Sequence, residues 1–104
     1  MKRLEEKLAA LAAAGETITY GALAKELGLG MADLTAHLEA LMEQDAAQGR
    51  PFRAALLRQR LSPDHLPAPG FFLKAAELGQ PTNDPAEFTK AHRDANSMSP
   101  NIPG

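Results

Sequence analysis

The segment Ile18–Gly30, which reads ITYGALAKELGLG, decides the expected fold. Thr19 is a good N-cap residue, and Leu23 and Leu27 lie one turn apart on the helix that it would begin. Gly28-Leu29-Gly30 then predicts a tight turn, because glycine takes a positive φ at low cost. The segment therefore predicts a short helix and a glycine turn that leads into the next element.

Longer helices are expected on both sides of this segment. Upstream, Leu4, Leu8 and Leu11 recur at helical spacing, and Gly15 is a suitable left-handed cap for that helix. Downstream, a helix from about Met31 to Gln48 has the strongest helical period of the chain, carried by Leu34, Leu38, Leu41 and Met42. Three helices thus form the predicted core.

The part of the chain that follows is less regular. Phe52 to Leu61 is interpreted as the one convincing strand, because apolar residues alternate along it, although Ala54 to Arg60 could also be helical. Ser62 to Pro69 carries three prolines and is expected to be a loop. Gly70 to Leu73 either pairs back as a second strand, which completes a small β-hairpin, or opens a short helix that ends at Gly79.

A last helix is expected to begin at Asp84-Pro85-Ala86-Glu87. The Asp is the cap, the Pro takes the first helical position, and Glu87 lies three residues after the cap, as in a capping box. The expected division is a winged-helix-like domain over residues 1–79, a linker and C-terminal helix over 80–96, and a flexible tail over 97–104.

Composition agrees with a small, mainly helical domain. The 104 residues are 44% hydrophobic and 23% charged, and they include twenty Ala and fifteen Leu but no Val and no Trp. Ala and Leu favour helices, whereas sheets favour β-branched and aromatic residues. The absence of cysteine excludes thiolate catalysis and zinc–thiolate sites. The acidic N-terminal region does not resemble a signal peptide, no apolar run suits a membrane, and a cytoplasmic location is expected.

Helix, glycine turn, helix, strand, loop and strand is the order of a winged helix-turn-helix domain. Ile18–Gly28 resembles the start of this motif in the DNA-binding domain of the DNA alkyltransferases and the alkyltransferase-like proteins. Gly49-Arg50-Pro51 and Pro69-Gly70-Phe71-Phe72 are similar to segments of small uncharacterised bacterial winged-helix proteins. The resemblance covers about Leu4 to Gly79 and implies a winged-helix fold with a DNA-binding role.

The chain departs from the alkyltransferase pattern at the residues that carry the chemistry. Those enzymes have a Pro-Cys-His-Arg active site, and their relatives replace the Cys with Trp, but this chain has neither residue. The arginine of their recognition helix is also missing, since no arginine lies between Gly30 and Gln48. The resemblance therefore implies the architecture without the reaction, and we expect no enzymatic activity.

The charge pattern predicts where a nucleic acid would bind. Met31 to Asp45 contains four acids and no Lys or Arg, so this helix should be repelled by phosphates. The stretch from Ala46 to Pro63 contains no acid and four arginines: Arg50, Arg53, Arg58 and Arg60. These four arginines are the predicted phosphate contacts of a non-catalytic module that binds DNA or RNA weakly as a monomer.

Two alternatives remain open. The arginines could instead pair with acids of the preceding helix, and the chain would then be a protein-interaction or homodimerisation module whose acidic third helix or final helix meets a basic or apolar partner. More remotely, His65 or His92 could belong to an enzyme. A metal site formed by the three histidines, which include His37, is not supported by their spacing, and no cofactor is expected.

Overall fold

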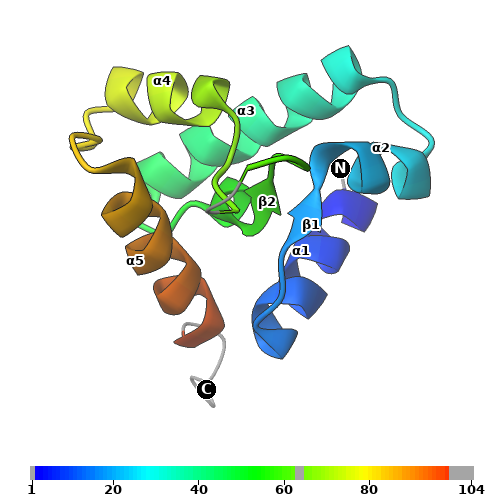
Figure 1. Ribbon diagram of the computed structural model, residues 1–104, viewed down its shortest axis with the longest axis horizontal. Coiled ribbons are helices and arrows are strands. Elements are labelled where there is room, and N and C mark those ends of the chain that lie inside the picture. The colour runs from blue at the N-terminus through cyan, green and yellow to red at the C-terminus, as the bar shows by residue number, and fades with distance from the viewer. Residues whose placement is uncertain (1, 63–64, 99–104) are drawn as a thin grey trace.

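The computed structural model describes residues 2–62 and 65–98. These residues are mainly helical and include one small two-stranded sheet, as predicted. Figure 1 shows α3 and α4 side by side across one end of the molecule, with α1 and α5 extending from that end on opposite sides and β2 near the centre. In chain order the elements are α1 (Lys2–Ala14), β1 (Ile18–Thr19), α2 (Tyr20–Leu27), α3 (Met31–Ala47), the 3-10 helix η1 (Arg53–Leu56), β2 (Leu57–Arg58), α4 (Pro69–Glu77) and α5 (Pro85–Met98).

The first three helices form where the sequence predicts them, and local interactions define their ends. The side chain of Thr19 caps α2, because its Oγ1 accepts a hydrogen bond from the Ala22 N–H at 3.3 Å. Gly28 ends the same helix with φ of 68°. Gly15 also has φ of 68° just after α1, and Gly49 has φ of 66° after α3. Each of these glycines takes the left-handed conformation that favours glycine.

The strand predicted from Phe52 to Leu61 is wrong over most of its length. Residues Arg53–Leu56 form η1, and only Leu57–Arg58 is extended. The cause is burial on all sides: four consecutive residues, Ala54 to Leu57, are buried, so no side of this segment faces solvent as one side of a half-buried strand would. The alternation of apolar residues therefore does not indicate a pleated strand here.

The small sheet differs from the expected hairpin as well. β2 pairs in parallel with β1, and Ile18 lies opposite Leu57. The segment after the loop, for which a strand and a helix were both considered, is the helix α4. No second strand therefore follows β2 within residues 65–98, and a helix stands where the second strand of a hairpin was considered.

The core lies between the helices and η1, and it is made mostly of leucine with two buried phenylalanines, Phe52 and Phe71. Phe71 is buried in the core, and Phe72 is half-buried at its edge. The rings of Phe52, Phe71, Phe88 and His92 form one cluster, in which Phe52 and His92 stack with centroids 5.0 Å apart.

The final helix begins as predicted, and the Glu87 N–H donates to Oδ1 of Asp84 at 3.2 Å. α5 packs against both α1 and η1, so its inner face is part of the core. Ser97 and Met98 belong to α5, and the rest of the predicted tail, 99–104, lies outside the described residues.

Candidate functional site

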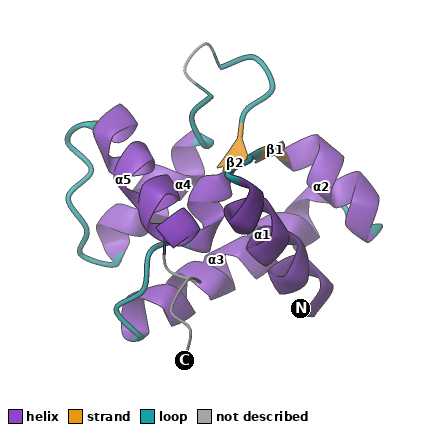
Figure 2. Ribbon diagram, turned by 90° about the horizontal axis from the view of Figure 1, so that it is seen from below, coloured by secondary structure: helices purple, strands orange, loops and turns teal. Residues whose placement is uncertain are grey.

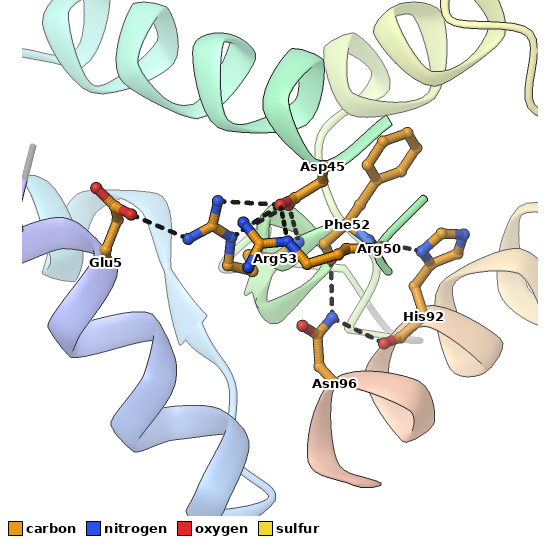
Figure 3. A network of polar contacts seen from close by, with 7 residues as sticks. All are labelled: Glu5, Asp45, Arg50, Phe52, Arg53, His92 and Asn96. Atoms are coloured by element: carbon orange, nitrogen blue, oxygen red, sulfur yellow. Dashed lines mark hydrogen bonds and ion pairs between the residues drawn. The ribbon is translucent and has the colours of Figure 1, made fainter. Parts of the chain in front are cut away.

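Arg53, one of the predicted phosphate contacts, is held inside the molecule by Asp45. Asp45 lies near the end of α3 and is fully buried. Its carboxylate accepts hydrogen bonds from the Arg53 backbone N–H at 3.0 Å and from Nε at 3.0 Å, and Nη2 of Arg53 lies 2.9 Å from Oδ1. Figure 3 shows the two side chains facing each other between α3 and η1. The pair joins the end of α3 to the start of η1.

Arg50 and Glu5 extend this network from either side (Figure 3). Nη1 of Arg53 donates to Glu5 of α1 at 3.2 Å, and Nε of Arg50 lies 3.6 Å from Asp45. Burial acts to lower the pKa of Arg53, but hydrogen bonds and ion pairs with Asp45 and Glu5 outweigh it, so the pKa is raised. The guanidinium of Arg53 therefore stays charged and paired within its own chain.

The other two arginines lie elsewhere. Arg58 is half-buried on β2, and Arg60 is exposed in the turn that follows. Neither forms an ion pair with the described residues. The four arginines therefore differ in how free they are. Arg53 is enclosed by Asp45 and Glu5, Arg50 contacts Asp45 with about half of its side chain exposed, and Arg58 and Arg60 form no ion pair among the described residues.

Three residues of α5 complete the structural network. Nδ1 of His92 accepts the Phe52 N–H at 2.8 Å, and the Asn96 amide donates to the Phe52 carbonyl at 2.9 Å. Arg93 donates to the carbonyls of Ala55 at 2.6 Å, Leu57 at 3.2 Å and His65 at 2.6 Å. Because η1 is too short to satisfy its own backbone, α5 supplies the missing partners.

These roles were not identified from the sequence, although a signal exists for them. Asp45 lies four residues after Leu41 and seven after Leu38, which places its carboxylate on the buried stripe of α3. A carboxylate on such a stripe requires a cation nearby. His92 and Asn96 likewise follow Phe88 at intervals of four residues, on one face of α5.

An apolar groove lies between α3 and α4, where the loop before α4 meets the start of α2. It has a volume of about 160 Å³. Leu38 and Met42 are buried at its base, and Met31 is 52% exposed beside it. The remaining lining residues are Tyr20, Thr35, Glu39, Ala54, Ala68, Gly70 and Phe71.

Tyr20 helps to hold the groove open at one end. Its hydroxyl oxygen accepts the Ala68 N–H at 2.9 Å, which fixes the residue just before α4. Burial raises the pKa of Tyr20, although this hydrogen bond and the charge of Arg93 both act to lower it. The half-buried ring and the hydrogen-bonded hydroxyl give Tyr20 a packing role.

The rim of the groove along α3 is acidic. Glu39 lines the groove, and Glu43 follows one turn later. Nζ of Lys74 on α4 donates to Glu43 at 2.6 Å, and this bond raises the pKa of Lys74, as do the nearby carboxylates Glu77 and Glu39. Three carboxylates thus surround a single ammonium group, and the local charge is negative.

No protein-family model, curated protein sequence or solved structure matches this chain. Among residues 2–62 and 65–98, no group of three or more His, Asp or Glu side chains is arranged to hold a metal ion. In the same part of the chain, no helix is long and apolar enough to cross a membrane. The apolar groove, and the two arginines that form no ion pair among these residues, are features that suit a partner.

Proposed function

We propose that this chain is a non-catalytic protein-interaction module whose α3–α4 groove receives an apolar side chain of a partner polypeptide. The observation that carries the proposal is the groove itself: Leu38, Met42 and Phe71 form an apolar floor beside an exposed methionine, Met31. A methionine at such a surface adapts its shape to different partners. Exposed apolar surface with a polar rim is typical of interaction sites.

The size of the groove favours a single side chain over a small substrate. Pockets for drug-sized ligands occupy roughly 300–1,000 Å³, whereas this groove has about 160 Å³. Its floor also lacks convergent polar groups, since Glu39 and Thr35 lie at exposed positions. An aliphatic side chain from a partner is the occupant that suits these dimensions.

Charge favours a basic polypeptide over a nucleic acid at this surface. α3 carries Glu39 and Glu43 on its exposed side and no Lys or Arg, so it repels phosphates and attracts cationic side chains. Nucleic-acid binding through the arginines remains a prediction that rests mainly on Arg58 and Arg60, because Arg50 already contacts Asp45. Arg53 would have to leave a buried carboxylate before it could contact a phosphate.

Peptide selection on the intact chain tests the proposal. Random peptides are displayed and enriched on the wild-type chain, and the bound peptides are then measured against Gly70→Leu. Gly70 lines the groove in the first turn of α4, and a Cβ there meets no atom within 4 Å, so we expect the larger side chain to be tolerated and to obstruct the groove. Gly21→Leu is the matched control, because Gly21 holds the same position in α2, has the same free space and does not line the groove.

The expected result is enrichment of peptides with Leu, Met or Phe next to Lys or Arg. Gly70→Leu should weaken their binding by about tenfold or more, because the partner loses the burial of one apolar side chain. Gly21→Leu should bind them as the wild type does. The proposal fails if no peptide is enriched, or if the two variants bind the enriched peptides equally well.

A further inference from the structure

Leu61 is the most exposed of the large apolar side chains in the described residues, with 83% of its surface accessible. It lies in the loop between β2 and α4, which projects from the body of the molecule in Figure 2. A leucine so exposed contributes little to the stability of its own chain. It also cannot be the occupant of its own groove, since a docked side chain would be buried.

Local hydrogen bonds hold Leu61 in a defined position. The Ser62 N–H donates to the Gln59 carbonyl at 3.3 Å, so Arg60 and Leu61 are the central residues of a tight turn. The Gln59 N–H donates to the Leu66 carbonyl at 2.9 Å, and Oγ of Ser62 accepts the Leu66 N–H at 3.0 Å. The turn is therefore ordered before any partner arrives, which reduces the entropy lost on binding.

The charges beside Leu61 complement those of the groove. Arg60 directly precedes it and Arg58 lies three residues before it, and Ala46 to Pro63 contains no acid. The α3–α4 groove combines an apolar floor with Glu39 in its lining, and Glu43 lies one turn further along α3, where it binds Lys74. A leucine that follows two arginines thus combines the apolar group and the positive charge that suit the groove.

We infer that the partner of the α3–α4 groove is a second copy of this chain, which inserts Leu61 into the groove while its Arg58 and Arg60 face Glu39 and Glu43. This inference rests on the proposed function and names its occupant. It also gives Arg58 and Arg60, which form no ion pair within residues 2–62 and 65–98, a role that does not involve nucleic acid. The Leu61 turn and the groove are different surfaces of the chain. Two copies can therefore each insert Leu61 into the other's groove, or copies can bind head to tail in a row.

Site-directed cross-linking of the full-length chain tests the contact. The chain has no cysteine, so single cysteines report one pair of positions at a time. Thr35→Cys places a thiol in the groove, and Leu61→Cys places one on the turn while keeping a small apolar side chain. When Thr35→Cys is mixed with Leu61→Cys, a disulfide between the two variants should form quickly. We expect its rate of formation to be at least about tenfold higher than that of the disulfide between Thr35→Cys and Met98→Cys. Met98 is the matched control, since it is 69% exposed at the end of α5.

Sedimentation of cysteine-free variants gives an independent measurement of association. Leu61→Ser should weaken self-association by about tenfold or more, whereas Met98→Ser should leave it unchanged. Glu39→Arg should also weaken it, and mixing Glu39→Arg with Arg60→Glu should restore it, because the swapped charges attract again. Circular dichroism on each variant checks that the helices are intact.

Several outcomes overturn the inference. A chain that stays monomeric up to about 1 mM has no homotypic contact of measurable strength. Association that survives Leu61→Ser but is lost in Met98→Ser places the contact at α5. Retention of a nucleic acid that is lost when Arg58 and Arg60 become Ala, without any effect on self-association, assigns these arginines to a phosphate backbone. If the chain is monomeric and selected peptides still bind in a manner sensitive to Gly70→Leu, only the identity of the partner is wrong and the proposed function stands.

Discussion

The backbone N–H of Phe52 donates to Nδ1 of His92 over 2.8 Å, and the two rings stack at 12° to each other. An imidazole nitrogen that accepts a hydrogen bond carries no proton, so His92 is neutral with its proton on Nε2. Burial lowers the pKa of His92 from its ordinary value of 6.5, and the charge of Asp45 opposes this effect only in part. This contact fixes the entry to η1 on the inner face of α5.

The His92 contact predicts a loss of stability in mild acid. The unfolded chain takes up a proton on His92 at pH values below about 6.5, whereas the folded chain resists it, so the free energy of unfolding falls as the pH drops from about 7 to 5. His92→Gln should be less stable at pH 7 and should show a smaller decrease over this range. Urea unfolding at several pH values measures both. Identical pH slopes for the two proteins would contradict this role for His92.

The Asp45–Arg53 pair predicts a large effect from removing one partner. Asp45→Ala leaves the mostly buried guanidinium of Arg53 without its carboxylate and should cost about 3–5 kcal/mol in the free energy of unfolding. Arg50→Ala removes a half-exposed partner at 3.6 Å and should cost less than about 1 kcal/mol. Replacing both Asp45 and Arg53 with apolar residues should cost less than Asp45→Ala alone. Equal costs for Asp45→Ala and Arg50→Ala in denaturant unfolding would show that the buried pair is unimportant.

Replacing two of the glycines with alanine should change the stability of the chain in opposite directions. Gly28 ends α2 with φ of 68°, so Gly28→Ala should destabilise the chain by about 1–2 kcal/mol. Gly70 lies inside the first turn of α4 without a positive φ and with free space around it, so Gly70→Ala should stabilise the chain by about 0.5 kcal/mol. Thermal unfolding compares the two variants with the wild type. A destabilised Gly70→Ala would also show that Gly70→Leu is not a clean probe of the groove.

Nucleic-acid binding is predicted to be weak. With Arg53 and Arg50 engaged by Asp45, at most two arginines reach phosphates, and the slope of log affinity against log salt should be no steeper than about −2. Fluorescence anisotropy with a labelled duplex and a labelled single strand at about 50 mM salt measures this slope. A slope near −4 would mean that Arg50 and Arg53 leave Asp45 and that all four arginines bind phosphate.

Local signals made much of the helical core predictable. Leucines at helical spacing locate α1, α2 and α3, and the caps Thr19, Gly28 and Asp84 act on residues only a few positions away. Such interactions depend on neighbours in the chain, so a single sequence contains them. The segment from Ala54 to Leu57 contains no such signal, because burial on every side removes the contrast between apolar and polar positions.

The candidate site was harder to predict, because it is built by packing across long separations in the chain. The groove exists only once α4 lies against α3, and a strand remained an alternative for that segment. The charge pattern predicts four free arginines, yet Arg53 is paired with Asp45, eight residues earlier, and with Glu5, forty-eight residues earlier. Charge alone does not show which cations a fold encloses. The prediction that the arginines could pair with acids of the third helix is confirmed for Arg50 and Arg53.

Methyl signals of methionine test the groove most directly. Met31 and Met42 line it, whereas Met98 lies on α5 and does not. With the methionine methyl groups labelled with carbon-13, a short peptide holding one leucine between two arginines is titrated into the chain, and a peptide with glutamates in place of the arginines serves as the control. We predict that the first peptide shifts the Met31 and Met42 signals and leaves Met98 in place, and that the control shifts none of them. Unchanged Met31 and Met42 signals, or equal shifts with both peptides, would contradict a groove that binds an apolar side chain flanked by basic residues.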